Sequence, residues 1–300
     1  MRTSILAGSP VTRESCAAQH FGLWAVKAGW LQNAVAAIQA GSWQPKADAR
    51  ERDGSGKPRV AYQISDGVAL VDIEGQMTKG SSSYGGASTI EVRENIRQAV
   101  ADTNVNSVLL VIDSPGGTVA GTADLADEVT AADKVKPVWA YIDGDGASAA
   151  YWVAAMAREI RAGRGSEIGS IGVFGVVEDT SGLAEAEGIK VHVVSTGPLK
   201  GAFMPGTPVT EEQLAFLREN VMDHAAQFFD AVSKARQIEG KALDAVTTGA
   251  YWIAGKAKKM RLIDGVGTQD SVVIEMANKY RNRTKRRMAG AIANVMEMDS

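Results

Sequence analysis

From residue 62 onward, short apolar runs alternate along the chain with amphipathic segments of ten or more residues. The runs lack the apolar–polar alternation of a half-exposed strand, which is typical of strands covered on both faces. The pattern therefore predicts an α/β domain with a largely parallel sheet. The predicted strands are GVALVDIEG, SVLLVID, PVWAYID, EIRAG, IGVFGVV and IKVHVVS, and the predicted helices include IEVRENIRQAVAD, TADLADEVTAA, residues 210–236 and residues 270–281.

The segment before this domain has a different pattern. Residues 14–40 carry apolar side chains at helical spacing, and Gly41 is a plausible stop. The charged, Gly- and Pro-rich stretch PKADARERDGSGKPR then predicts a linker. The predicted organisation is a helical N-terminal arm (1–44), a linker (45–62), the main domain (63–278) and a basic C-terminal tail (279–300) with six basic residues from Lys279 to Arg287.

Composition narrows the class of protein. The chain has 300 residues, 45% of them hydrophobic, and a formal net charge of −3, as in an ordinary globular protein. Its single cysteine, Cys16, allows no intramolecular disulfide. No apolar run approaches the roughly 20 residues that span a bilayer, and the N-terminal apolar stretch is too short for a signal peptide. We therefore expect a cytoplasmic protein that is not secreted and has no transmembrane segment.

Several common chemistries lack their signatures. GxGxxG and GxxxxGK[ST] are absent, as is the GxSxG elbow of α/β-hydrolases. The three histidines, His20, His192 and His224, lie far apart, so zinc hydrolysis is disfavoured. Of these, His192 is the one candidate for a histidine-based triad. No metal or organic cofactor is expected.

A single hydroxyl, Ser148, lies among glycines and alanines in GDGASAAYWVAAMA, residues 144–157. One interpretation is an N-cap, because a serine that opens a helix commonly accepts a bond from a backbone N–H. The other interpretation is a nucleophile, because small neighbours keep the approach of a peptide carbonyl open.

Three more features carry candidate chemistry. Lys200 is the one formally charged residue between Lys190 and Glu211 and has apolar neighbours along the chain, so burial would favour the neutral amine of a general base; a solvated loop lysine is the alternative. The paired glycines of DSPGG, residues 113–117, would present backbone N–H groups as an oxyanion hole, or form a tight turn. Ser170 in GSIGV is a turn residue or a hydroxyl that orients an amine.

These segments together resemble a known family. LLVIDSPGGTVAG, GASAAYWVAAMA, GSIGVFG and TGPLKGAFMPGTPVTEEQ are similar, in that order, to motifs of the signal-peptide-peptidase-A-like serine peptidases. The soluble build, with its Trp-rich N-terminal arm, most resembles the tailed-phage head-maturation (prohead) proteases. The resemblance covers residues 63–275 and implies a Clp-protease/crotonase-like α/β fold with repeated β-β-α units, preceded by a helical N-terminal arm.

The resemblance also implies residue roles. Ser148 matches the nucleophile of a Ser-Lys dyad, Lys200 its general base, and Ser170 the serine that hydrogen-bonds the lysine. The implied oxyanion hole comprises Gly116, Gly117 and the Ala149 N–H, and we expect Val119 and Tyr151 to line the substrate pocket. The chain departs from the family at Ala149 and Ala150, where relatives often carry two glycines.

The implied function is a serine endopeptidase that cleaves scaffold or capsid proteins during phage head maturation. We expect protein or peptide substrates, a homo-oligomer, contact with scaffold, capsid or portal protein, no membrane contact, and nucleic-acid contact only through the basic tail. The apolar stripe of residues 210–236 either joins copies or packs within the chain. MAGAIA, residues 288–293, is a candidate self-cleavage site.

Two alternatives stay open at this point. The first is a non-catalytic head-assembly or scaffold protein on the same fold, favoured by Ala149 and Ala150 in place of glycines. The second is a crotonase-type acyl-CoA enzyme, which would need neither Ser148 nor Lys200 and would place a carboxylate in its pocket.

Overall fold

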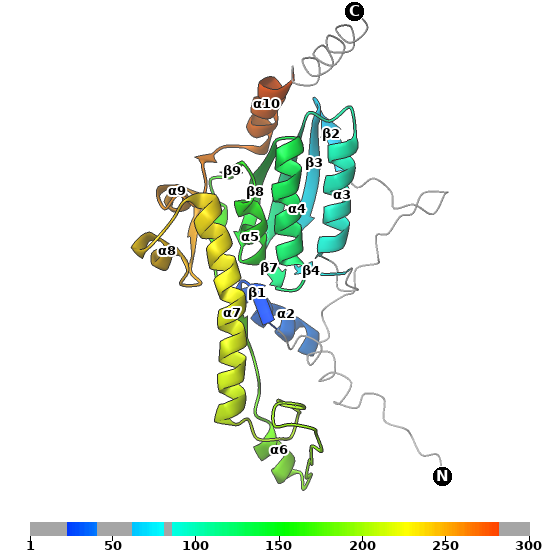
Figure 1. Cartoon of the computed structure of the whole chain (residues 1–300), viewed down its shortest axis with the longest axis vertical. Helices are drawn as coiled ribbons and strands as arrows, with labels where there is room; N and C mark the ends of the chain where they lie inside the picture. Colours follow the sequence, from blue (N-terminus) through cyan, green and yellow to red (C-terminus); the bar gives the residue numbers. More distant parts are fainter. Residues whose placement is uncertain (1–22, 41–61, 81–85, 282–300) are drawn as a thin grey trace, which may run out of the picture.

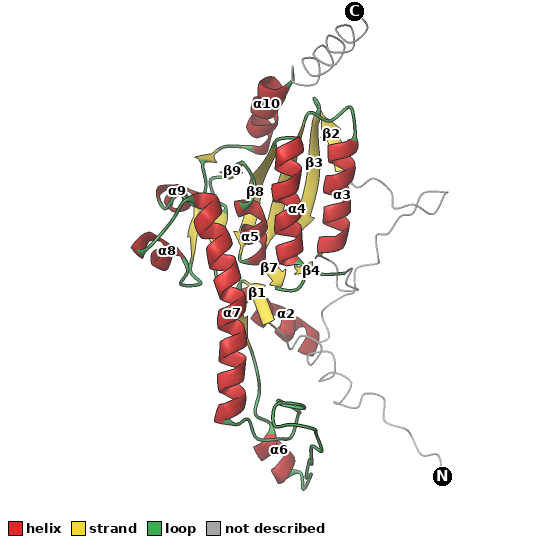
Figure 2. Cartoon of the chain, in the orientation of Figure 1, coloured by secondary structure: helices red, strands yellow, loops and turns green. Residues whose placement is uncertain are grey.

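The computed structural model describes residues 23–40, 62–80 and 86–281, and the structural statements below concern these residues. They form a mixed α/β structure in which helices flank two sheets (Figures 1 and 2). The predicted α/β class with parallel strands is confirmed. Residues 282–300, which hold most of the basic tail and the MAGAIA segment, lie outside the described residues.

The larger sheet has eight strands in the order β12-β10-β8-β6-β3-β2, with β9 paired to β8 and β13 to β9. Strands β3, β6, β8 and β10 run parallel, and the edge strands β2 and β12 are antiparallel to their neighbours. The strands are β2 (Tyr62–Ser65), β3 (Val68–Glu74), β6 (Ser107–Ser114), β8 (Val138–Ala147), β9 (Glu159–Ala162), β10 (Glu167–Gly169), β12 (Tyr251–Ile253) and β13 (Gly265–Val266).

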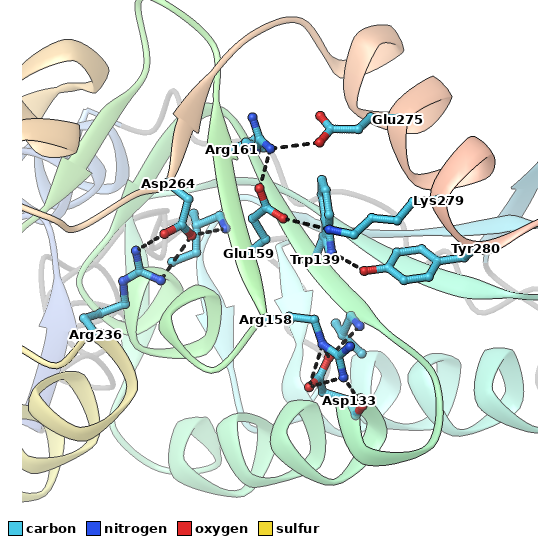
Figure 3. Close-up of polar contacts among 12 residues, drawn as sticks. Asp133, Trp139, Arg158, Glu159, Arg161, Arg236, Asp264, Glu275, Lys279 and Tyr280 are labelled. Carbon is cyan, nitrogen blue, oxygen red and sulfur yellow. Dashed lines mark hydrogen bonds and ion pairs between the residues drawn. The ribbon is translucent and has the colours of Figure 1, made fainter. Parts of the chain in front are cut away.

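Helices cover both faces of this sheet, which explains the unbroken apolar runs of its strands. Helices α3 (Thr89–Ala101) and α4 (Thr122–Val135) pack on one face, and α10 (Gln269–Tyr280) packs on the other. Figure 3 shows how α10 is fastened: the Trp139 indole N–H donates to the Tyr280 hydroxyl over 3.2 Å, and Arg161 pairs with Glu275 over 3.0 Å.

The smaller sheet has five strands in the order β11-β1-β7-β4-β5. Strand β1 runs antiparallel to both of its neighbours, so a segment of the predicted N-terminal arm lies inside this sheet. The strands are β1 (Leu23–Val26), β4 (Met77–Thr78), β5 (Ala87–Ser88), β7 (Gly116–Thr118) and β11 (Phe174–Gly175).

The buried residues of the long helix α7 (Glu211–Arg236) all lie in its C-terminal half. There the buried Phe228 ring stacks on Trp152 of α5 (Ala149–Ala155), with ring centroids 4.8 Å apart. Its N-terminal half extends beyond the sheets, and α6 (Ser181–Ala186) lies past that end (Figure 1). The other helices are α2 (Ala28–Gln39), α8 (Lys241–Val246) and α9 (Ala254–Lys259).

Two predicted elements differ from the structure. The helix predicted over 14–40 is a strand, β1, followed by α2, and its part before Leu23 lies outside the described residues. β1 forms hydrogen-bonded pairs with β7 on one side and β11 on the other. These pairings join segments far apart in the sequence, so the local spacing of apolar residues does not reveal them. The strand predicted for IKVHVVS is irregular and exposed, because this segment lies away from the sheets (Figure 1).

Across residues 23–40, 62–80 and 86–281, no helix has both the length and the apolar character that a membrane span requires.

Candidate active site

Ser148 lies where β8 ends and α5 begins. Its side chain makes no capping bond to the helix; instead the hydroxyl donates to the Gly172 carbonyl over 3.4 Å. The residue is 1% exposed. Ser148 thus occupies the N-cap position of α5, but the capping bond that the N-cap interpretation expects is not made, and its buried hydroxyl lies at the strand–helix turn.

The backbone at Ser148 is strained. Its φ of 55° and ψ of −120° lie in a region that residues other than glycine rarely adopt. Two bonds hold it there: its N–H donates to Gly169 O over 2.7 Å, and the Trp152 N–H donates to its carbonyl over 2.9 Å. Such a conformation costs about 1–3 kcal/mol and is commonly found at functional sites.

Strand β7 brings the paired glycines to this turn. Gly116 has a φ of 100°, and a Cβ on it would lie 2.9 Å from the Ala147 carbonyl oxygen and 3.0 Å from the Ala149 nitrogen. These two atoms belong to the residues on either side of Ser148. A Cβ on Gly117 would collide with the Met77 carbonyl of β4. Both glycines are therefore required for the close approach of β7.

Ser170 lies beside Ser148. Strands β8 and β10 are parallel neighbours with Ala147 opposite Gly169, so Ser148 and Ser170 each follow the last residue of an aligned pair. Ser170 has a φ of 53°, and its N–H donates to Ala250 O over 2.7 Å. The structure thus brings together Ser148, Ser170 and the β7 glycines.

Lys200 is not part of this group within one chain. It is exposed in the segment between α6 and α7, and its N–H donates to Gly197 O over 3.1 Å. Figure 1 shows this segment beyond the N-terminal end of α7, away from both sheets. The apolar surroundings that we expected for the Lys200 amine are therefore not formed by its own chain.

The two predicted pocket residues make contacts within the protein. The Val119 N–H donates to Leu23 O over 3.4 Å, and the fully buried Tyr151 hydroxyl donates to Leu262 O over 2.8 Å. Burial raises the pKa of the Tyr151 phenol well above its usual value. A contact of either residue with substrate stays a prediction.

Sequence reasoning missed Lys27, which follows β1. Its amine pairs with Asp145 over 3.2 Å and with Glu167, and lies 4.3 Å from the centre of the Tyr251 ring. Burial by itself lowers the pKa of Lys27, but the two carboxylates outweigh it and raise the pKa overall. No local pattern signals this cluster, because the carboxylates lie 118 and 140 residues further along the chain.

Metal binding has no evident site in the part of the chain that the structure describes. There, no three His, Cys, Asp or Glu side chains gather into a group that could hold an ion.

Known proteins are similar to this chain in sequence. A family model described as Peptidase family S49 matches residues 130–282. Protease 4 of Salmonella typhi is 28% identical over 211 residues, which cover 70% of this chain and 34% of that protein. Capsid assembly protease C of Escherichia phage lambda is 26% identical over 241 residues, which cover 78% of this chain and 54% of that protein. The chain thus spans about a third to a half of these relatives.

Among solved structures, an enoyl-CoA hydratase/isomerase family member aligns with a TM-score of 0.44 and 15% identity over 75% of this chain and 74% of that one. This likeness is too distant to bear on function. The family match covers more than half of the chain, including Ser148, Ser170 and Lys200, and it confirms the predicted resemblance. The chain belongs to peptidase family S49.

Proposed function

We propose that the chain is a serine endopeptidase with Ser148 as its nucleophile. The observation that carries the proposal is the Ser148 hydroxyl, which caps no helix and lies at a strained turn beside the β7 glycines. Membership of peptidase family S49 supports a hydrolytic role for this serine. A crotonase-type acyl-CoA reaction would require neither the strained backbone of Ser148 nor its hydroxyl.

The proposed reaction is acyl transfer to serine. The neutral Lys200 amine takes the Ser148 proton as the hydroxyl oxygen attacks a peptide carbonyl. The oxyanion accepts hydrogen bonds from the Gly117 and Ala149 N–H groups, a kind of interaction worth about 3–4 kcal/mol per donor. Protonated Lys200 then gives its proton to the leaving amine, and water hydrolyses the acyl-enzyme. Ser170 orients the Lys200 amine.

In this mechanism Lys200 comes from another copy, because the segment between α6 and α7 that carries it lies beyond the N-terminal end of α7, away from both sheets (Figure 1). The projecting half of α7 and the loop before it expose apolar side chains, among them Phe216, Met222 and Val194 at 41%, 58% and 98%. Exposed apolar surface of this kind commonly marks contacts between proteins. We therefore propose a homo-oligomer in which this arm of one copy completes the site of the next.

The proposed biological role is head maturation in a tailed phage, with scaffold or capsid protein as substrate. The similarity to a capsid assembly protease of phage lambda supports this role. The alternative, a non-catalytic head-assembly protein, makes a different prediction. Ser148 would be dispensable for head assembly if that alternative holds.

Active-site labelling tests the proposal. The purified chain is treated with a fluorophosphonate probe, and the labelled residue is located by mass spectrometry. We expect label on Ser148, none on Ser148→Ala, and at least about a hundredfold slower labelling of Lys200→Ala, since general-base catalysis contributes about 10²–10⁴-fold. Absence of label on Ser148 between pH 7 and 10, both in the parent chain and in a Lys27→Glu variant that breaks the ion pairs behind β1, would favour the assembly-protein alternative.

A further inference from the structure

Strand β1 occupies a slot between the strand that carries the candidate oxyanion glycines and β11. On one side Trp24, Ala25 and Val26 lie opposite Thr118, Gly117 and Gly116. On the other side Leu23 and Trp24 lie opposite Gly175 and Phe174. We call the position between β7 and β11 the β1 slot.

The carbonyl of Ala25 faces the candidate oxyanion hole. Hydrogen-bonding and non-hydrogen-bonding pairs alternate along an antiparallel ladder. Lys27 N–H donates to Pro115 O over 2.7 Å, and Val119 N–H donates to Leu23 O over 3.4 Å. The pair midway between them, Ala25 and Gly117, is therefore of the hydrogen-bonding type, with the Gly117 N–H directed at the Ala25 carbonyl.

A second contact supports this placement. A Cβ on Gly116 would collide with the Ala25 carbonyl oxygen and would also lie 3.0 Å from the Ala149 nitrogen. The Ala25 carbonyl thus lies on the side of Gly116 that adjoins the Ser148 turn. A peptide carbonyl held there, in an extended chain, has the position that a scissile carbonyl needs for attack by Ser148.

β1 is buried in the slot and is held there by ion pairs. Trp24, Ala25 and Val26 are 4%, 0% and 2% exposed. Directly after them, the Lys27 amine pairs with Asp145 and Glu167, which lie opposite each other on β8 and β10. Because its amine is held in ion pairs with both carboxylates, Lys27 acts as an anchor for β1.

We propose that the β1 slot is the groove that binds extended peptide substrates, and that β1 is an intramolecular occupant that blocks it. The proposal rests on the proposed function of Ser148. The occupant indicates the class of substrate: a segment that adds a strand between β7 and β11, with a small side chain at the Ala25 position and a large apolar one before it. Catalysis then requires that β1 leave the slot.

A disulfide that pins β1 tests the proposal. Trp24 and Thr118 form a non-hydrogen-bonding pair, whose Cα atoms are about 4.5 Å apart in an antiparallel ladder and thus within disulfide range. Trp24→Cys and Thr118→Cys are introduced into the full chain together with Cys16→Ser and Ser148→Ala. Binding of a fluorescein-labelled LWAVKA peptide is measured by anisotropy before and after reduction.

A second variant releases β1 instead of pinning it. Lys27→Glu places a third carboxylate beside Asp145 and Glu167, whereas Gln32→Glu adds a carboxylate at an exposed position of α2 and serves as the control. Both are made in the Ser148→Ala background.

We expect the peptide to bind Lys27→Glu at least about tenfold more tightly than the Gln32→Glu control. We expect the oxidised cysteine pair to abolish binding and reduction to restore it. Equal affinity in the two redox states, or in the two charge variants, would overturn the proposal.

Because these measurements lack the nucleophile, they are independent of catalysis. Fluorophosphonate labelling of the same variants with Ser148 restored then tests the proposed function. Peptide binding that follows the state of β1, with Ser148 never labelled, would reject the peptidase mechanism and retain the groove.

Discussion

At the scale of single residues, the site depends on two glycines and one strained serine. The close packing of β7 against β1, β4 and the Ser148 turn leaves no room for a side chain at Gly116 or Gly117. The pair could be predicted from sequence because two adjacent glycines in DSPGG indicate a place where the backbone is approached closely. Lys27 could not be predicted, because its partners are brought to it only by the fold.

Gly117→Ala tests the requirement for close packing. We expect this substitution to lower the free energy of unfolding by about 1–3 kcal/mol, because its methyl group collides with the Met77 carbonyl. The control is Gly182→Ala in α6, where nothing lies within 4 Å of the added methyl group, and there we expect no loss. Urea unfolding of both variants gives the comparison; similar losses would contradict it.

Asp102 illustrates a pH-dependent contribution at this scale. Its carboxylate accepts bonds from the Asn104 N–H over 2.8 Å and from the Tyr62 hydroxyl over 3.1 Å. The Asn104 bond is the largest cause that lowers the pKa of Asp102, and the Tyr62 bond lowers it further. The resulting stabilisation is present above the unfolded-state pKa of about 3.9 and is lost as pH falls through the lower folded-state pKa.

We therefore expect Asp102→Ala to destabilise the protein by less than about 1 kcal/mol at pH 7, because solvent screens this carboxylate, and by less again at pH 3. Urea midpoints of the parent and the variant at the two pH values check this. A difference that persists undiminished in acid would show that the side chain acts by packing.

At the scale of elements, helix α7 has two halves with different surroundings. The stripe expected from its sequence is buried at Ala225, Phe228 and Val232, whereas Phe216 and Met222 on the other half are exposed. Periodicity predicts such a helix well, because an apolar stripe is a property of the helix itself. Periodicity does not show how much of the helix is covered by the rest of the protein. It also does not distinguish a four-residue strand such as β1 from a turn of helix.

Phe228→Ala removes the ring that stacks on Trp152 of α5. We expect a loss of about 3–5 kcal/mol in unfolding free energy, as for other buried phenylalanines. The matched control, Phe216→Ala on the same helix, should lose less than about 1 kcal/mol when measured on the monomeric chain. Equal losses would mean that the N-terminal half of α7 packs as tightly as the C-terminal half.

At the scale of the whole molecule, the chain separates the two partners of the proposed dyad. Ser148 is buried at the centre, and Lys200 is exposed on a projecting arm. Both residues could be found from sequence, since each belongs to a local motif of the family. Their relation could not, because in the proposed mechanism it depends on contacts between copies, which no local pattern encodes.

Mixing two inactive variants tests whether the dyad forms between copies. Ser148→Ala lacks the nucleophile and Lys200→Ala lacks the base, so each alone should fail to hydrolyse a denatured protein substrate. After the variants are co-refolded at equal amounts, we expect about a quarter of the parental activity, because random pairing gives that share of intact sites. An inactive mixture from correctly assembled particles would contradict the shared site.

The strain at Ser148 has an evolutionary consequence. A positive φ costs an alanine about as much as a serine but costs glycine little, so Ser148→Gly should raise the melting temperature while Ser148→Ala should not. Differential scanning calorimetry of the Ser148→Gly and Ser148→Ala variants would measure the difference in melting temperature. If it is found, selection for thermal stability alone would favour glycine at position 148, and the proposed role of Ser148 in proteolysis would be what keeps the serine.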